Sequence, residues 1–160
     1  MKKINYRKLA ISLIIPQLAG FLGSIANITS LDTWYKGLIK PVFNPPGWIF
    51  GPVWTLLFVL MGVALYLVWD NKGIFNKYKV DFVIKIFSLQ IILNIVWSWL
   101  FFGAMSPLLA LLEIIVLWVA ILWNMVVFYR LNKTAGYLLL PYLLWVSFAS
   151  VLNFSLWWLN

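Results

Sequence analysis

The sequence of 160 residues contains no cysteine and no histidine, and only 4 of its residues are acidic. The missing cysteines exclude disulfides and thiolate chemistry. Without histidine, the chain lacks the commonest ligand of zinc and haem iron and the usual general base near neutral pH. We therefore expect no metal site, no required cofactor and no conventional hydrolytic centre.

Charge of either sign is scarce: charged residues make up 10% of the chain and apolar residues 64%, with a mean hydropathy of +0.97. A water-soluble domain needs a more polar surface than this. Five apolar runs can each cross a hydrocarbon core of roughly 30 Å as a helix. We predict an all-α integral membrane protein of the cell membrane, a single multi-pass domain over residues 1–160. The predicted helices cover residues 6–28, 47–69, 80–102, 107–129 and 135–158.

Basic residues are distributed unevenly along the chain. Only Lys36 and Lys40 lie in or near the connection after the first helix, whereas the other ten of the 12 fall at the opposite ends of the helices. Positive residues stay preferentially in the cytoplasm, so we predict a cytoplasmic N-terminus and an extracytoplasmic C-terminus. The net charge of +8 then reflects topology and contact with anionic lipid, and no nucleic-acid partner is expected. The ten residues are Lys2, Lys3, Arg7, Lys8, Lys72, Lys77, Lys79, Lys85, Arg130 and Lys133.

The connection over residues 29–46 is rich in aromatic residues and proline, with Trp34, Tyr35, Pro41, Pro45 and Pro46. Proline fixes φ and removes a backbone donor, so such a segment keeps a defined shape beside a membrane. We predict that it forms a lid.

Several of the 11 tryptophans lie deeper in the predicted spans than an interfacial aromatic belt requires. Most of the tryptophans, including Trp54, Trp97 and Trp99, belong to the predicted outer half of the bundle, which lies beneath the lid. Trp145 lies near mid-span. Indoles offer flat apolar faces and edge N–H donors, which suit a planar, hydrophobic, partly anionic ligand. Ala149, one turn after Trp145, would leave room beside that ring.

Polar residues within the spans have two readings. Gln90, Asn94 and Ser98 recur every four residues and so share one face of the third helix. One reading is hydrogen bonding between helices, which is common in membrane bundles. The other makes Asn94 a polar contact in a ligand pocket.

Several ordered motifs resemble those of the translocator protein family, also called tryptophan-rich sensory proteins or peripheral benzodiazepine receptors. The first reads Trp34-Tyr35-x3-Ile39-Lys40-Pro41-x3-Pro45-Pro46-x-Trp48 and continues as Gly51-Pro52-x-Trp54. Two later ones are Leu93-Asn94-x2-Trp97 and Pro141-Tyr142-x2-Trp145-x2-Phe148-Ala149. The animal proteins carry a C-terminal sterol motif with a central Tyr, where this chain has Phe154, so the likeness is to bacterial members.

The resemblance implies a five-helix bundle, often a homodimer, with a pocket under the first loop. Family members bind porphyrins such as protoporphyrin IX and drug-like hydrophobic ligands of the benzodiazepine site. Photochemical degradation of porphyrin, reported for some relatives, would involve Trp54 and Trp145. Residues matching the family's pocket are Tyr35, Pro45, Trp54, Asn94, Trp97, Trp145, Phe148 and Ala149.

Two other functions stay open. The chain could be a small membrane transporter of porphyrin-like or other hydrophobic substrates that uses Glu113, because acidic residues within membranes are functional candidates. The resemblance implies an acidic residue at this place in the fourth helix, and Glu113 is otherwise expected to be structural or to have a polar partner. The remaining alternative is a scaffold that binds no ligand, in which the aromatic residues only pack.

Overall fold

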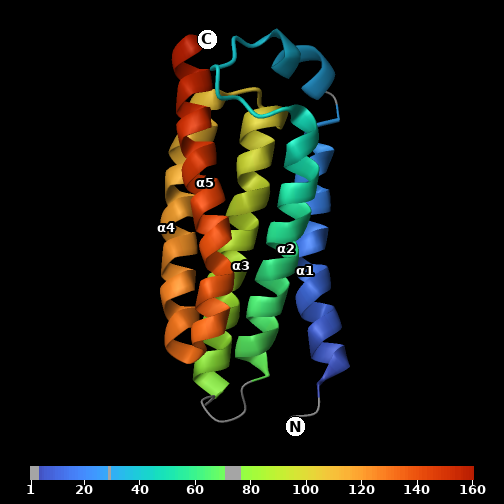
Figure 1. Ribbon diagram of the computed structural model, residues 1–160, viewed down its shortest axis with the longest axis vertical. Coiled ribbons are helices and arrows are strands. Elements are labelled where there is room, and N and C mark those ends of the chain that lie inside the picture. Colours follow the sequence, from blue (N-terminus) through green and yellow to red (C-terminus); the bar gives the residue numbers. More distant parts are fainter. Residues whose placement is uncertain (1–3, 29, 71–76) are drawn as a thin grey trace.

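The structure, a computed structural model, describes residues 4–28, 30–70 and 77–160, without the side chains of residues 77–80. In these ranges it contains five long α-helices, two short π-helical segments and no β-strand. All five long helices are long and apolar enough to cross a membrane, which confirms the predicted five-helix membrane bundle (Figure 1). They are α1 Tyr6–Ile25, α2 Gly47–Trp69, α3 Lys77–Ser98, α4 Pro107–Leu131 and α5 Lys133–Leu159.

The helix ends differ from the predicted ones mainly through local turns. α2 has the predicted bounds, but α1 ends at Ile25, three residues early, because tighter i to i+3 bonds hold the chain that follows. α3 passes into a π-helical segment, η2 Trp99–Gly103. α4 and α5 are both longer than predicted and meet at Asn132, whose side chain accepts a hydrogen bond from the Ala135 backbone N–H at 3.2 Å and so caps α5.

The helices form a closed ring in which α1 contacts α2, α2 contacts α5, α5 contacts α4, α4 contacts α3, and α3 contacts α1. The two chain ends lie at opposite ends of this bundle, and the predicted lid lies beside the C-terminal end (Figure 1). The lid contains the other π-helical segment, η1 Leu31–Tyr35. Residue 29 of the lid lies outside the described residues.

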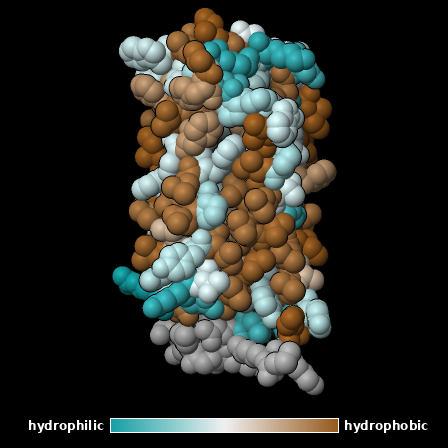
Figure 2. Space-filling model, in the orientation of Figure 1, coloured by the Kyte–Doolittle hydropathy of each residue, from teal (hydrophilic) through white to brown (hydrophobic). Residues whose placement is uncertain are grey.

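The surface of the bundle agrees with a membrane location. Hydrophobic residues cover most of its sides, while hydrophilic ones gather toward the two ends (Figure 2). At the end away from the lid, the Lys8 ammonium lies 3.5 Å from the Asp70 carboxylate and donates to the Trp69 carbonyl at 3.1 Å. These contacts tie the start of α1 to the end of α2. Lys2, Lys3 and Lys72, used above for orientation, lie outside the described residues.

Small residues bring α1 close to its neighbours, as expected for helices in lipid. A Cβ on Gly62 would lie 2.7 Å from the Ser12 carbonyl oxygen, so the α2 backbone there approaches the α1 backbone directly. On α1, Gly20 faces the ring of Phe58 and Gly23 faces Ser98. Glycine is needed at Gly62, because the nearest atoms that a Cβ would meet there belong to the α1 backbone and cannot move aside, whereas a Cβ on Gly23 would make an ordinary contact.

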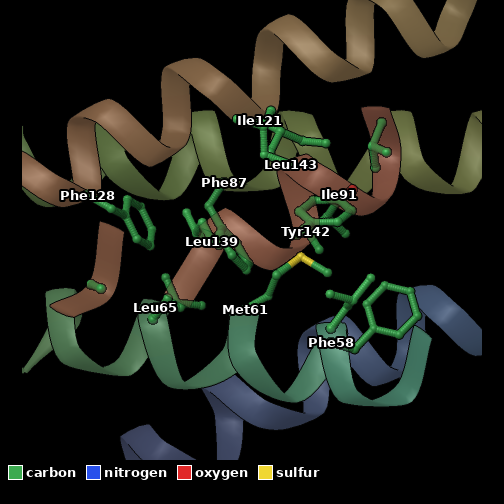
Figure 3. Close-up of a cluster of buried hydrophobic side chains, with 14 of the residues drawn as sticks. Phe58, Met61, Leu65, Phe87, Ile91, Ile121, Phe128, Leu139, Tyr142 and Leu143 are labelled. Carbon is green, nitrogen blue, oxygen red and sulfur yellow. The ribbon is translucent and has the colours of Figure 1, made fainter. Parts of the chain in front are cut away.

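The hydrophobic core fills the bundle from its middle toward the end away from the lid. Met61 and Val68 of α2, Ile121 and Phe128 of α4, and Leu139 of α5 are completely or almost completely buried. Figure 3 shows Met61, Ile121, Phe128 and Leu139 meeting between the helices, with Phe58 and Tyr142 in the same cluster. This packed region forms a floor beneath the space under the lid.

Candidate functional site

A cavity of about 790 Å³ lies between the floor and the lid. Its walls come from α1, α2, α3, η2 and α5 and from the lid, while α4 contributes no lining residue. The volume falls within the range of roughly 300–1,000 Å³ that is usual for small-molecule sites.

Seven of the eight predicted pocket residues line this cavity: Tyr35, Pro45, Trp54, Asn94, Trp97, Trp145 and Ala149. Phe148 does not line it. Its ring instead packs against those of Trp145, at 5.5 Å between centroids, and Phe43, at 6.4 Å. Trp145 and Ala149, four residues apart, share the face of α5 that lines the cavity. Phe148 lies beside that face and packs against the Trp145 ring.

The structure adds lining residues that the motifs did not indicate. Phe50 and Phe58 flank Trp54 at intervals of four residues on α2, and all three line the cavity. This helical spacing was visible in the sequence and could have identified them. Lys40 also lines the cavity from the lid.

The aromatic walls are held by ring contacts. The Trp54 indole stacks on Phe58 at 5.5 Å and meets the edge of Tyr142 at 6.1 Å. The Trp97 indole stacks on Phe101 at 5.3 Å, and Phe50 makes an edge contact with Trp145 at 5.9 Å. Such contacts fix ring orientation and contribute roughly 0.5–1.5 kcal/mol each beyond simple burial. The indole faces are therefore ordered before any ligand arrives.

Two polar groups of the wall already have partners. The Asn94 side chain donates to the Tyr142 hydroxyl at 3.0 Å, and the Trp97 indole N–H donates to the Asn153 side-chain oxygen at 3.1 Å. Asn94 thus forms a hydrogen bond between helices, as the first reading predicts, because it links α3 to α5. It also lines the cavity, so the second reading, a polar contact to a ligand, stays a prediction. Gln90 and Ser98, on the same face of α3, are buried as well.

The Trp145 indole N–H, unlike the polar groups of Asn94 and Trp97, has no hydrogen-bond partner in the described part of the chain. It is buried, although Trp145 lines the cavity. A buried donor without a partner costs about 1–3 kcal/mol. A ligand acceptor reaching this N–H would recover that free energy.

The other deep tryptophans do not reach the cavity. Trp99 lies at the predicted depth, but it donates its indole N–H to the Leu22 carbonyl at 3.2 Å in an exposed position on the outside of the bundle and does not line the cavity. Residues 97 and 99 are separated by about 200° around a helix, and only one of them can face inward. Trp118 donates to the Ser147 hydroxyl at 2.8 Å and packs on the core.

Glu113, expected to be structural or to have a polar partner, has no hydrogen-bond partner among the described residues. Both of its carboxylate oxygens are buried. The side chain lies in the second turn of α4, where the packing of α4 on its neighbours encloses it, and no described donor reaches it. Glu113 does not line the cavity.

Side-chain hydrogen bonds hold the lid at two points, the first within the lid and the second between the lid and the end of α5. The Tyr35 hydroxyl donates to the Asn44 side-chain oxygen at 3.1 Å. The Asn160 side chain accepts from the Ile39 backbone N–H at 2.9 Å and donates to the Ile39 carbonyl at 3.1 Å. We call this second contact the Asn160 latch, because it joins the end of α5 to the middle of the lid. Burial raises the pKa of the Tyr35 phenol above its ordinary value, so the phenol stays neutral at physiological pH.

Comparison with known proteins assigns the family. The profile of the TspO/MBR family matches residues 12–159, which include most of α1 and all the elements after it. The chain belongs to the TspO/MBR family. The tryptophan-rich protein TspO of Archaeoglobus fulgidus is 45% identical over 157 residues, 98% of this chain and 99% of that protein. The translocator protein of Homo sapiens is 36% identical over 144 residues, 90% of this chain and 85% of that protein. The tryptophan-rich sensory protein of Cereibacter sphaeroides is 35% identical over 129 residues, 81% of this chain and 78% of that protein.

Membership of the TspO/MBR family and the five apolar helices together make this an integral membrane protein. The described residues include no group of three or more His, Cys, Asp or Glu side chains that could hold a metal ion. The cavity presents indole faces and single hydrogen-bonding groups.

Proposed function

We propose that the protein binds tetrapyrroles of the protoporphyrin IX type, and other flat hydrophobic ligands of the benzodiazepine-site class, in the cavity beneath the lid. The observation that carries this proposal is the cavity of about 790 Å³ lined by Trp54, Trp97 and Trp145. Binding would use stacking and burial of apolar surface, worth roughly 25 cal/mol per Å² of area removed from water. A shift of the Trp145 ring that uncovers its buried N–H would let it donate to an acceptor on the ligand.

The test is a titration of the protein in detergent with protoporphyrin, monitored by quenching of tryptophan fluorescence. We expect saturable quenching in the native protein and weaker binding in Trp54→Phe and Trp145→Phe. Trp48→Phe is the matched control, because Trp48 begins the same helix as Trp54 but is 74% exposed. Equal, non-saturating quenching in all four proteins would mean that the pigment only dissolves in the detergent.

We also propose that a bound porphyrin can be degraded in light, as the resemblance implies. On illumination, the indole of Trp54 or Trp145 would donate one electron to the excited porphyrin. This transfer leaves an indole radical cation and a porphyrin radical anion, and molecular oxygen is the oxidant for the later steps. Bleaching that needs light and oxygen, and that slows when the donor tryptophan is replaced, would support this reaction. Bleaching at the native rate in the double variant Trp54→Phe/Trp145→Phe would contradict it.

We propose further that the lid and the C-terminus face away from the cytoplasm, since the described basic residues near the helix ends concentrate at the other end of the bundle. The chain contains no cysteine, so single-cysteine variants report orientation without background. An impermeant maleimide added to intact cells should label Lys36→Cys and leave Lys133→Cys unlabelled, and the reverse pattern would overturn the assignment. The homodimer implied by the resemblance stays a prediction, which cross-linking in native membranes would check.

Transport through Glu113 is a second candidate, favoured by the buried carboxylate without a partner. Because Glu113 lies outside the cavity lining, transport of a ligand held there would need a rearrangement of α4 and α5. Glu113→Gln should abolish gradient-driven porphyrin flux in vesicles if this reading is right. Unchanged flux in the variant, or no flux in the native protein, would remove it.

A further inference from the structure

Lys40 is the one charged side chain among the described residues that line the cavity. It lies on the lid and is half-buried. Its ammonium group donates to the carbonyls of Lys36 and Leu38, both at 3.2 Å. It also lies 4.8 Å from the centre of the Tyr35 ring, within the range of a cation–π contact. The lid therefore holds a positive charge at the mouth of an otherwise uncharged site.

This charge has no anionic partner in the described part of the chain. The neighbouring acid, Asp32, pairs with Lys36 at 2.6 Å, and both of those side chains are largely exposed. Tyr35, beneath the Lys40 ammonium, is a neutral phenol at physiological pH, as any phenol of ordinary pKa is, and burial raises its pKa further. The ammonium group has three N–H donors, and the two carbonyls account for two of them. One donor and the whole formal charge remain for a ligand.

The positions of Lys40 and the indoles divide the cavity into two chemical regions. Deep in the site, Trp54 and Trp145 provide apolar faces. At the lid, Lys40 provides a cation that is partly shielded from water, where a charge-assisted hydrogen bond is stronger than one between neutral groups. A molecule with a flat apolar body and an acidic group on one edge would match both regions in one orientation.

We propose that Lys40 selects ligands that carry a carboxylate and orients them with the acidic edge toward the lid. This inference rests on the proposed function, since it specifies the ligand class of the same cavity. It makes Lys40 a specificity residue, whereas the indoles supply most of the affinity. A neutral ligand of the same shape should still enter the cavity but should gain nothing from Lys40.

The experiment compares protoporphyrin, which has two carboxylates, with its uncharged dimethyl ester. Each is titrated into the native protein and into Lys40→Gln, Lys40→Arg and Lys36→Gln. Lys36→Gln is the matched control, because it removes the same charge four residues away on the same lid, from a side chain that does not line the cavity. Comparing the acid-to-ester ratio between proteins cancels the different partition of the two pigments into detergent.

We expect the native protein to prefer the acid over the ester by about fivefold, the effect of a partly exposed ion pair. Lys40→Gln should lose this preference by weakening acid binding alone, while Lys40→Arg and Lys36→Gln should keep it. Added salt should reduce the preference in the native protein, because it screens the ion pair. Circular dichroism of Lys40→Gln should match that of the native protein.

Two results would overturn the inference. One is equal binding of acid and ester by the native protein. The other is a preference that survives in Lys40→Gln, as would follow if Lys40 instead contacted a lipid phosphate at the membrane surface. If both pigments still bind saturably and Trp54→Phe weakens them, the proposed function stands and only the role of Lys40 is lost. If neither pigment saturates the native protein, both proposals fail.

Discussion

Replacing Asn160 with alanine should open the lid more often. The substitution removes both hydrogen bonds of the Asn160 latch, at 2.9 Å and 3.1 Å to Ile39. An intramolecular hydrogen bond contributes a net 0.5–1.5 kcal/mol or so, and these two are exposed to water, so the low end applies and the pair is worth about 1 kcal/mol. With 1.4 kcal/mol corresponding to a factor of ten, the open lid should be populated about fivefold more.

The assay is stopped-flow dilution of the porphyrin-loaded protein into excess detergent, which reports the rate of ligand release. If release requires an open lid, Asn160→Ala should release porphyrin about fivefold faster than the native protein. Ser155→Ala is the control, because it removes an exposed side-chain hydrogen bond of 2.9 Å near the end of α5 that stays within the helix and does not reach the lid. Release from Asn160→Ala at the native rate would refute the argument that this latch holds the lid.

Three further predictions concern packing and the cavity. Gly62→Ala should destabilise the protein by about 1–3 kcal/mol in thermal unfolding, since a Cβ there would lie 2.7 Å from a backbone oxygen of α1. Gly51→Ala is the control and should not destabilise it, because a Cβ there would meet nothing within 4 Å. Equal melting temperatures of the two variants would contradict this prediction. Ala149→Leu should weaken porphyrin binding at least tenfold in the fluorescence titration by filling the cavity that Ala149 lines, and native affinity would show that the ligand binds elsewhere. Tyr35→Phe should speed porphyrin release a few-fold, because it removes a hydrogen bond of about 1 kcal/mol to Asn44 that holds two parts of the lid together. Unchanged release would mean that this bond does not restrain the lid.

Much of the fold was predictable because lipid permits few alternatives. A run of about 20 apolar residues must form a helix there to satisfy its backbone, so all five helices were found from hydropathy. The exact ends depend on features that hydropathy does not measure. The cap provided by Asn132 lengthens two helices at once, and the π-helical segment at Trp99–Gly103 has no hydrophobic signature.

The sequence predicts how deep in the bundle the site residues lie better than it predicts which way their side chains face. Motif resemblance brought seven lining residues together, but depth alone could not separate Trp97, which faces inward, from Trp99, which faces outward. Counting residues around the helix would have separated them. The contact between Asn160 and Ile39 joins residues 121 positions apart in the chain, and no local pattern predicts it.

The division of the bundle into a solid half and a hollow half has a consequence for how such a protein can change. The densely packed end, around Met61, Leu139 and Phe128, holds most of the buried contacts between the helices, while many side chains at the other end line the cavity. Substitutions there remove few packing contacts, so they can alter which molecules are accepted at little cost to folding. One fold could thus change its ligand specificity, by evolution or by protein engineering, without first gaining stability.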